Sequence, residues 1–391
     1  MSASSSNGSA TGSRGAAKVL GAVAVVVAVL VYAVLKDLSG YHGNWTGFIH
    51  FGVDFAAGTH PPHGAIVLHG ANADGDDGQF YYLIAQDPLH ARLAGLSGQT
   101  FRALRIGYPL LVSLASSISG VSVPVAMVVV NFVIVLVVTA GFAWYALRQG
   151  WSPWWALVLG LLPGFLTATL HDLTDPLSVA LVLAGLIAWT HQRRWLAATL
   201  LIGAVLTREA DVVALVAVFL DQLLMSRRSE GGPGWIRRFL LKIGPILLPA
   251  AVFLGWLTYL VLRTRGMVPL ASSTFPFHTF VDDADSALGL AHSGQTYWAL
   301  TYEAIMVAAV MLAFWCAVRR PDALSIAAVG FVMALSIGSF APIWSDARDS
   351  LPVLSLLLVL GLRDRRRLNL AVCVAAALMT PVLLVLPGVL A

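Results

Sequence analysis

Apolar runs long enough to cross a lipid bilayer recur along this chain of 391 residues, from Lys18 to its last segment. A helix needs about 20 predominantly apolar residues to cross a hydrocarbon core of about 30 Å. Hydrophobic residues make up 58% of the sequence and charged residues only 11%, which is too few charges to cover a water-soluble globule. The sequence therefore predicts an all-α polytopic membrane protein.

The apolar runs follow one another without a large soluble block between them, so residues 18–391 are predicted to form a single membrane domain. Residues 1–17 are rich in Ser, Gly and Ala and are expected to be a disordered cytoplasmic segment. The first apolar run, residues 19–35, is too long for the core of a signal peptide, and we expect a retained first span.

Basic residues set the expected orientation, because Lys and Arg are enriched in cytoplasmic loops. They gather at Arg148, at Arg193 and Arg194, and in residues 227–242, 319–320 and 363–367. Two long loops, residues 37–103 and 264–296, then face outward and carry many of the acidic residues. These basic loops account for the net charge of +4, and no basic and aromatic patch indicates a nucleic-acid partner.

Nine segments are predicted to cross the membrane once each: residues 18–36, 104–119, 153–170, 174–190, 240–263, 297–318, 322–340, 350–362 and 368–390. Residues 196–224 have basic residues at both ends and a charged centre at 207–211, which predicts two half-helices. A crossing over residues 104–119 would already return the chain to the cytoplasm, where Arg148 is also expected. Residues 124–147 must then enter and leave on the same side, so they are also predicted to form two half-helices, with a break near Asn131. The total is about 11 to 13 transmembrane or half-membrane helices, and broken spans of this kind line protein cavities.

The acidic segment DGDDGQFYYLIAQDP, residues 74–88, lies in the first outer loop. Asp76 or Asp77 is placed to cap a helix over Gly78–Gln86, which Asp87 and Pro88 would end. The helix carries three adjacent aromatic residues, and aromatic rings favour the headgroup level of a bilayer. We expect a juxtamembrane helix that holds a carboxylate at the lip of the membrane.

Residues 77–85, DGQFYYLIA, fit the pattern D-x-x-[FW]-Y-x-x-I-A and resemble the first-loop motif of GT-C membrane glycosyltransferases. The resemblance is strongest to the mannosyltransferases of this superfamily that use polyprenyl-phosphate mannose. Shorter matches follow in the same order at residues 105–111, 173–177, 206–208 and 348–354. Asp76 stands where the family often has tryptophan, so the choice of catalytic carboxylate between Asp76 and Asp77 stays open.

The resemblance implies a GT-C-like bundle and an inverting transfer of one sugar, mannose in the first place, from a polyprenyl-phosphate donor to an extracytoplasmic hydroxyl. The acceptor would be a glycan, a glycolipid or a protein. Asp77, or else Asp76, would act as the base that deprotonates this hydroxyl. Arginine suits the donor phosphate through its fixed fork of donors, and the candidates are Arg208, Arg348 and Arg105. The expected pocket residues are Gln79, Tyr81, Tyr82, His171, Asp172, Asp175 and Glu209.

This chemistry requires no metal, although carboxylates and phosphates can hold Mg²⁺ or Mn²⁺. His60, His63 and His69 are irregularly spaced, and we interpret them as ordinary loop residues. The amino-acid usage favours a bacterial plasma membrane. The main alternative is a transporter or lipid flippase whose polar cavity opens to the outer face, because broken helices and intramembrane charges also line transport paths.

Overall fold

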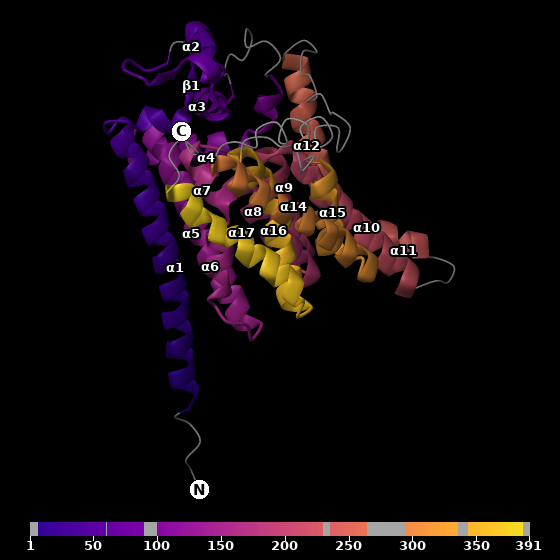
Figure 1. Ribbon diagram of the computed structural model, residues 1–391. Helices are drawn as coiled ribbons and strands as arrows, with labels where there is room; N and C mark the ends of the chain where they lie inside the picture. The colour runs from indigo at the N-terminus through magenta and orange to yellow at the C-terminus, as the bar shows by residue number, and fades with distance from the viewer. Residues whose placement is uncertain are drawn as a thin grey trace.

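The computed structural model describes residues 7–59, 61–89, 100–229, 235–263, 294–334 and 343–385. In this part of the chain the fold is a bundle of helices, one end of which is covered by the first loop (Figure 1). The helices of the bundle are α1 (Asn7–Gly40), α4 (Gly107–Ser119), α5 (Val123–Arg148), α6 (Trp155–Gly160), α7 (Pro163–Leu170), α8 (Asp175–Thr190), α9 (Arg194–Thr207), α10 (Val212–Ser229), α11 (Trp235–Lys242), α12 (Gly244–Arg263), α14 (Gly294–Arg319), α15 (Ala323–Ala334), α16 (Ile343–Arg363) and α17 (Arg367–Val385).

The described residues of the first loop form short helices and one pair of short strands. Its elements are η1 (Trp45–Ile49), β1 (Phe51–Gly52), α2 (Val53–Thr59), β2 (Val67–Leu68), η2 (Gly70–Asn72), α3 (Gly78–Gln86) and η3 (Thr100–Leu104). The strands β1 and β2 form one short parallel pair in which Phe51 lies opposite Val67. Helix α3 has the predicted bounds. Its aromatic side chains were expected at the headgroup level of the membrane, but they are buried against the protein.

Four helical segments are long and apolar enough to cross a membrane: Gly15–Gly40 of α1, α5, α12 and Thr301–Arg319 of α14. Shorter apolar helices are α8, α9, α15 and Arg367–Pro381 of α17. On α5 the exposed apolar residues Val129, Val133 and Val137 recur every four residues, which forms one stripe along the helix. These features agree with the predicted all-α polytopic membrane protein.

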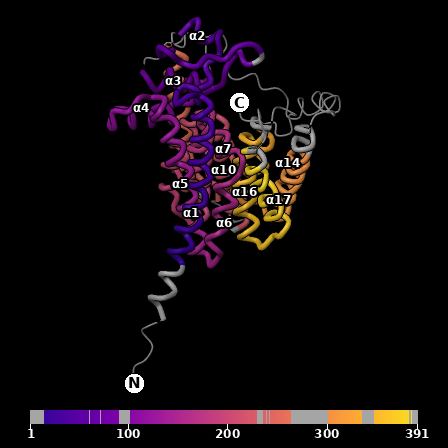
Figure 2. Tube along the Cα trace, turned by 60° about the vertical axis from the view of Figure 1, so that its left-hand side comes forward, coloured from indigo at the N-terminus to yellow at the C-terminus, as the bar shows by residue number. Residues whose placement is uncertain are grey.

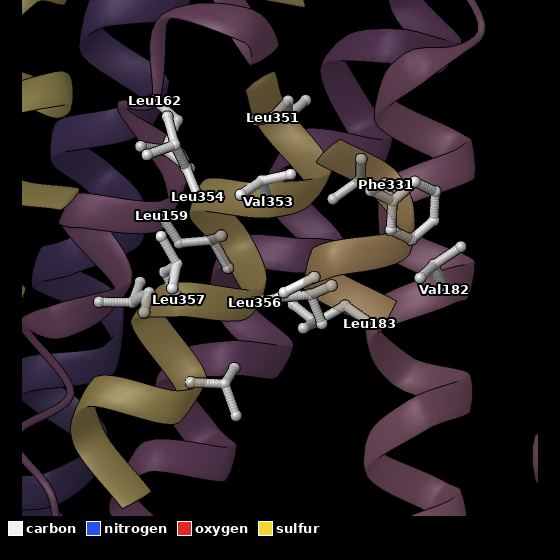
Figure 3. Packing of buried hydrophobic residues seen from close by; sticks show 14 of the residues in the cluster. Leu159, Leu162, Val182, Leu183, Phe331, Leu351, Val353, Leu354, Leu356 and Leu357 are labelled. Carbon is white, nitrogen blue, oxygen red and sulfur yellow. The ribbon is translucent and has the colours of Figure 1, made fainter. Parts of the chain in front are cut away.

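Helix α16 lies in the middle of the bundle and packs against α7, α8, α14, α15 and α17. From Leu351 to Leu360 every side chain is buried, as expected for a helix that is apolar on all sides. Its leucines interdigitate with Leu159, Leu183 and Phe331 of neighbouring helices (Figure 3). This packing fixes α16, which carries two of the charged residues of the candidate site near its start.

Two predictions are wrong for one reason: residues 104–119 were expected to cross the membrane, and residues 124–147 were expected to form two half-helices. Helix α5 is continuous through Asn131, and α4, with 13 residues, rises only about 20 Å and lies across the long helices at the first-loop end (Figure 2). Since α4 does not cross, α5 needs no break to return the chain to the basic side. The amide of Asn131 is satisfied inside the protein, where it donates to Tyr108 Oη and to the Leu173 carbonyl, each at 3.0 Å.

Two further expectations need correction. The span predicted over residues 153–170 is interrupted between α6 and α7, where Pro163 begins a new helix because proline suits a first helical turn. Residues 7–17, expected to be disordered, belong to α1, since extending an existing helix costs less than nucleating one. The predicted break at residues 207–211 is confirmed: α9 ends at Thr207 and a 3-10 turn, η4 (Glu209–Asp211), precedes α10. Residues 264–293, most of the predicted second outer loop, lie outside the described residues.

Candidate functional site

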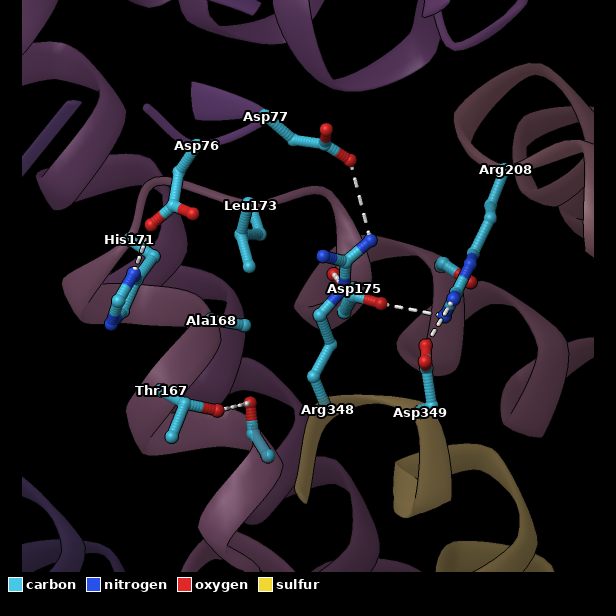
Figure 4. A network of polar contacts seen from close by, with 12 residues as sticks. Asp76, Asp77, Thr167, Ala168, His171, Leu173, Asp175, Arg208, Arg348 and Asp349 are labelled. Atoms are coloured by element: carbon cyan, nitrogen blue, oxygen red, sulfur yellow. Dashed lines mark hydrogen bonds and ion pairs between the residues drawn. The ribbon is translucent and has the colours of Figure 1, made fainter. Parts of the chain in front are cut away.

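A buried polar cluster lies at the first-loop end of the bundle, where several helices begin or end (Figure 4). Asp76 and Asp77 immediately precede α3, His171 immediately follows α7, and Asp175 is the first residue of α8. Arg208 lies at the turn between α9 and α10, and α16 supplies Arg348 and Asp349. The breaks between helices therefore bring charged residues from distant parts of the sequence to one place.

Asp77 is held by three arginines. Its Oδ1 accepts a hydrogen bond from Arg102 Nε at 2.6 Å, and its Oδ2 lies 3.1 Å from Arg105 Nη1 and 3.4 Å from Arg348 Nη2. Burial alone would raise the pKa of Asp77, but Arg348, Arg102 and Arg105 together hold this pKa well below its ordinary value. Asp77 occupies the N-cap position of α3 yet makes no capping hydrogen bond, so its carboxylate stays directed to the arginines.

Arg105 joins the first loop to the turn between α9 and α10. Its guanidinium binds both carboxylate oxygens of Glu209, at 2.7 and 2.6 Å, and donates to Tyr81 Oη at 2.7 Å. Burial would raise the pKa of Glu209, but this bidentate pair with Arg105 lowers it to about 2. Both groups of the pair are therefore charged at neutral pH.

Arg208 and Arg348 share the carboxylate of Asp175. Arg208 Nη1 lies 2.6 Å from Asp175 Oδ1, and Arg348 Nε lies 3.1 Å from Asp175 Oδ2. Arg208 also donates to Asp349 Oδ1 at 2.7 Å. Removal of one partner from a buried ion pair leaves an uncompensated charge, which lowers the free energy of unfolding by about 3–5 kcal/mol. The arginines and carboxylates of this cluster compensate one another.

A second cluster surrounds Asp76. Its Oδ2 lies 2.9 Å from His50 Nδ1 and 2.5 Å from His171 Nδ1, and the two Nδ1 atoms are 3.0 Å apart. Burial would raise the pKa of Asp76, but the hydrogen bonds from His171 and His50 hold it well below its ordinary value. Burial lowers the pKa of His171. Asp76 and Asp77, although adjacent, thus have separate sets of partners.

The backbone of the first loop is arranged to deliver His50 and Asp76 to this cluster. His50 adopts a left-handed conformation with φ 54°, which is uncommon for a residue with a side chain. Gly75 has φ 64°, and a Cβ on Gly75 would lie only 2.3 Å from the amide nitrogen of Gly52. The amide of Asp76 donates to the His50 carbonyl at 3.0 Å. Strained and glycine-dependent backbone of this kind concentrates at functional sites.

The remaining predicted residues take other positions. Gln79 accepts from the Gly52 amide at 3.0 Å and donates to the Asp74 carbonyl at 2.7 Å, so it supports the loop. Tyr82 packs edge-on against Phe51 and contacts Gln86, away from the arginines. Asp172 is fully buried, and neither of its carboxylate oxygens has a hydrogen-bond partner among the described residues. Burial raises its pKa well above the ordinary value.

Three residues of these clusters are absent from the sequence-based prediction. Arg102 precedes Arg105 by one helical turn, and this spacing is a signal that could have indicated it. Asp349 follows Arg348 directly in the sequence, and in the structure it pairs with Arg208. His50 has no sequence signal, because its partner His171 is 121 residues away.

Among the described residues, His50, Asp76 and His171 form the group of potential metal ligands, with one ligand atom each and all three atoms within 4.8 Å of one another.

No protein-family model matches the chain, and neither a curated protein nor a solved structure matches it. A functional inference therefore depends on the chemistry of the site itself, because a helical bundle alone does not specify an activity.

Proposed function

We propose that the chain is an inverting GT-C-type glycosyltransferase of the plasma membrane. It would move one sugar, mannose in the first place, from a polyprenyl-phosphate donor to a hydroxyl of a glycan, glycolipid or protein outside the cytoplasm. The observation that carries the proposal is the contact of Asp77 with Arg102, Arg105 and Arg348 at the buried ends of apolar helices. A donor phosphate in a membrane needs such cationic partners, and an attacking hydroxyl needs a nearby carboxylate.

The three arginines lower the pKa of Asp77, and a carboxylate with a low pKa is a weak base. The proposed role of Asp77 therefore requires that its pKa rise when the substrates bind. A donor phosphate is an anion and competes with the Asp77 carboxylate for Arg105 and Arg348. Once these arginines bind phosphate, Asp77 loses part of its cationic surroundings and its pKa rises toward the ordinary value. The base would therefore become effective in the complex with donor.

In that complex Asp77 takes the proton of the acceptor hydroxyl while the acceptor oxygen forms its bond to the anomeric carbon. The bond between this carbon and the phosphate oxygen breaks, and the phosphate leaves with the electron pair. Arg105 and Arg348 stabilise the negative charge that develops on the leaving phosphate. Arg208 is the next cation in the cluster and is held to the same carboxylate, Asp175, as Arg348. Asp77 is preferred over Asp76 as the base because it lies beside Arg105 and Arg348, which would bind the donor phosphate.

The test is transfer of label from polyprenyl-phosphate mannose to a membrane extract by the purified chain in liposomes. Asp77→Asn should abolish transfer and keep donor binding, because the arginines remain. Asp54→Asn is the matched control, since Asp54 is an exposed carboxylate of the same loop, and it should keep full activity. Full activity of Asp77→Asn would reject Asp77 as the base. Substrate-driven flux without any transfer would favour a transporter or lipid flippase.

A further inference from the structure

We propose that His50, Asp76 and His171 bind a divalent transition metal ion, with Zn²⁺ as the first candidate. Each residue offers one ligand atom, and these atoms are separated by 2.9, 2.5 and 3.0 Å. Two imidazoles and one carboxylate are ligands that zinc prefers, at about 2.0–2.2 Å from the ion. Movements below about 1 Å would bring the three atoms to tetrahedral spacing around such an ion.

With Asp76 as a carboxylate, protons on the two Nδ1 atoms can turn at most two of the three contacts into hydrogen bonds. An imidazole Nδ1 has one site in the ring plane, which holds either a proton or a lone pair. If both Nδ1 atoms are protonated, both can donate to Asp76 Oδ2, but two donor nitrogens then lie 3.0 Å apart with no hydrogen bond between them. If one Nδ1 is bare, its lone pair faces the carboxylate oxygen. A cation between the three atoms removes the conflict, because every lone pair then points at the ion.

The surroundings of the cluster fit a metal ligand set. His50 and His171 are both buried, at 4% and 3% exposure, whereas the Asp76 side chain is 19% exposed and offers a route from solvent. His50 Nε2 lies 3.0 Å from Tyr41 Oη. A hydrogen bond from the second ring nitrogen fixes the tautomer and leaves Nδ1 for the ion, as is usual for metal-bound histidines.

The ion would join two segments that lie far apart in the sequence: the first loop, through His50 and Asp76, and the turn after α7, through His171. Three protein ligands leave a fourth tetrahedral position for water or a substrate oxygen. Metal binding would also commit Asp76 to a ligand role beside Asp77. The inference does not depend on the proposed glycosyl transfer, because metal content can be measured without turnover.

The test uses the full chain purified in detergent, with bound metals measured by mass spectrometry. The wild type should hold about one equivalent of zinc or another first-row divalent metal. His50→Asn should reduce this content about tenfold or more, because asparagine tolerates the left-handed backbone and lacks the imidazole. His42→Asn is the matched control: His42 is exposed and also has positive φ, 52°, so its variant should retain the metal.

A second measurement guards against misfolded variants. Chelator-treated wild type and His42→Asn should develop the visible absorption of tetrahedral Co²⁺ on titration, whereas Asp76→Asn and His171→Gln should not, at unchanged secondary structure. Folded wild type without metal and without a Co²⁺ spectrum would overturn the inference, and so would wild-type metal content in His50→Asn. Stoichiometric metal in a chain that transfers no sugar would support the metal site and contradict the proposed function.

Discussion

Asp76 and Asp77 show how two adjacent carboxylates acquire different chemistry. Both residues precede the first residue of α3, in the turn that leads into the helix. Asp76 meets the imidazoles of His50 and His171, whereas Asp77 meets guanidinium groups. Both carboxylates have pKa values well below the ordinary one, but the cause differs: hydrogen bonds from histidines for Asp76 and arginine charges for Asp77.

Asp211 behaves in the opposite way and makes stability depend on pH. Burial raises its pKa from 3.8 to about 8, although Ser178 donates a hydrogen bond to Oδ2 at 2.7 Å. The folded chain therefore holds a proton that the unfolded chain releases. The contribution of Asp211 to the free energy of unfolding is fully present below about pH 4 and is lost progressively as the pH rises through the folded pKa. Each unit of difference between the folded and unfolded pKa corresponds to about 1.4 kcal/mol.

Replacement of Asp211 by Asn should remove this loss, since the amide stays neutral and its oxygen still accepts from Ser178. We expect the Tm of Asp211→Asn in detergent to exceed that of the wild type by about 2 °C or more at about pH 8.5, and by less at about pH 5. Thermal unfolding of both proteins at the two pH values measures the difference. An offset that is equal at both pH values would show that Asp211 ionises normally in the folded chain.

At the scale of elements, close contact between α7 and α16 positions the site. Gly164 of α7 faces the backbone of α16, and a Cβ at this position would lie 2.3 Å from the Ala347 carbonyl oxygen. Small residues allow membrane helices to approach closely in this way. Ala347 precedes Arg348 and Asp349, so the spacing of these two helices also sets the position of the arginine beside Asp77.

Gly164→Ala should therefore force α16 away from α7. We expect overpacking to cost about 1–3 kcal/mol, seen as a lower Tm, and glycosyl transfer to fall with it. Gly141→Ala in α5 is the control, because a Cβ there meets no heavy atom within 4 Å and alanine favours helix formation. Equal Tm values for the two variants would contradict the proposed role of this contact.

At the scale of the whole molecule, charge is separated between the two ends of the bundle. The buried site lies where α7, α9 and α16 have their ends beside the first loop (Figure 1). Basic residues lie at the opposite ends of helices, as Arg148 does in the last turn of α5. The positive-inside rule then predicts that the site faces away from the cytoplasm.

Cysteine labelling in intact cells tests this arrangement. Ser119→Cys at the end of α4 and Gln149→Cys after α5 are both exposed positions, and the native Cys316 and Cys373 are buried. Because α5 is long and apolar enough to cross the membrane once, a membrane-impermeant reagent added outside should label Ser119→Cys and spare Gln149→Cys until the membrane is opened. Labelling of both positions from outside would show that α5 does not cross.

The sequence by itself determined the helical class, most helix positions, the break at residues 207–211 and the helix Gly78–Gln86. Hydropathy and turn signals act over one or two turns, so they can be read locally. They could not indicate that α4 lies across the bundle, because its apolar residues resemble those of a crossing helix, nor that Asn131 is satisfied within a continuous α5.

Only the tertiary structure decided which charges meet. Arg348 reaches Asp77 across 271 residues, and His50 reaches His171 across 121. Arg208 pairs with Asp175 and Asp349, and not with its neighbour Glu209, which Arg105 binds. Such pairs form because a buried charge must find a partner wherever the packing of apolar helices places one, and that packing depends on the whole chain.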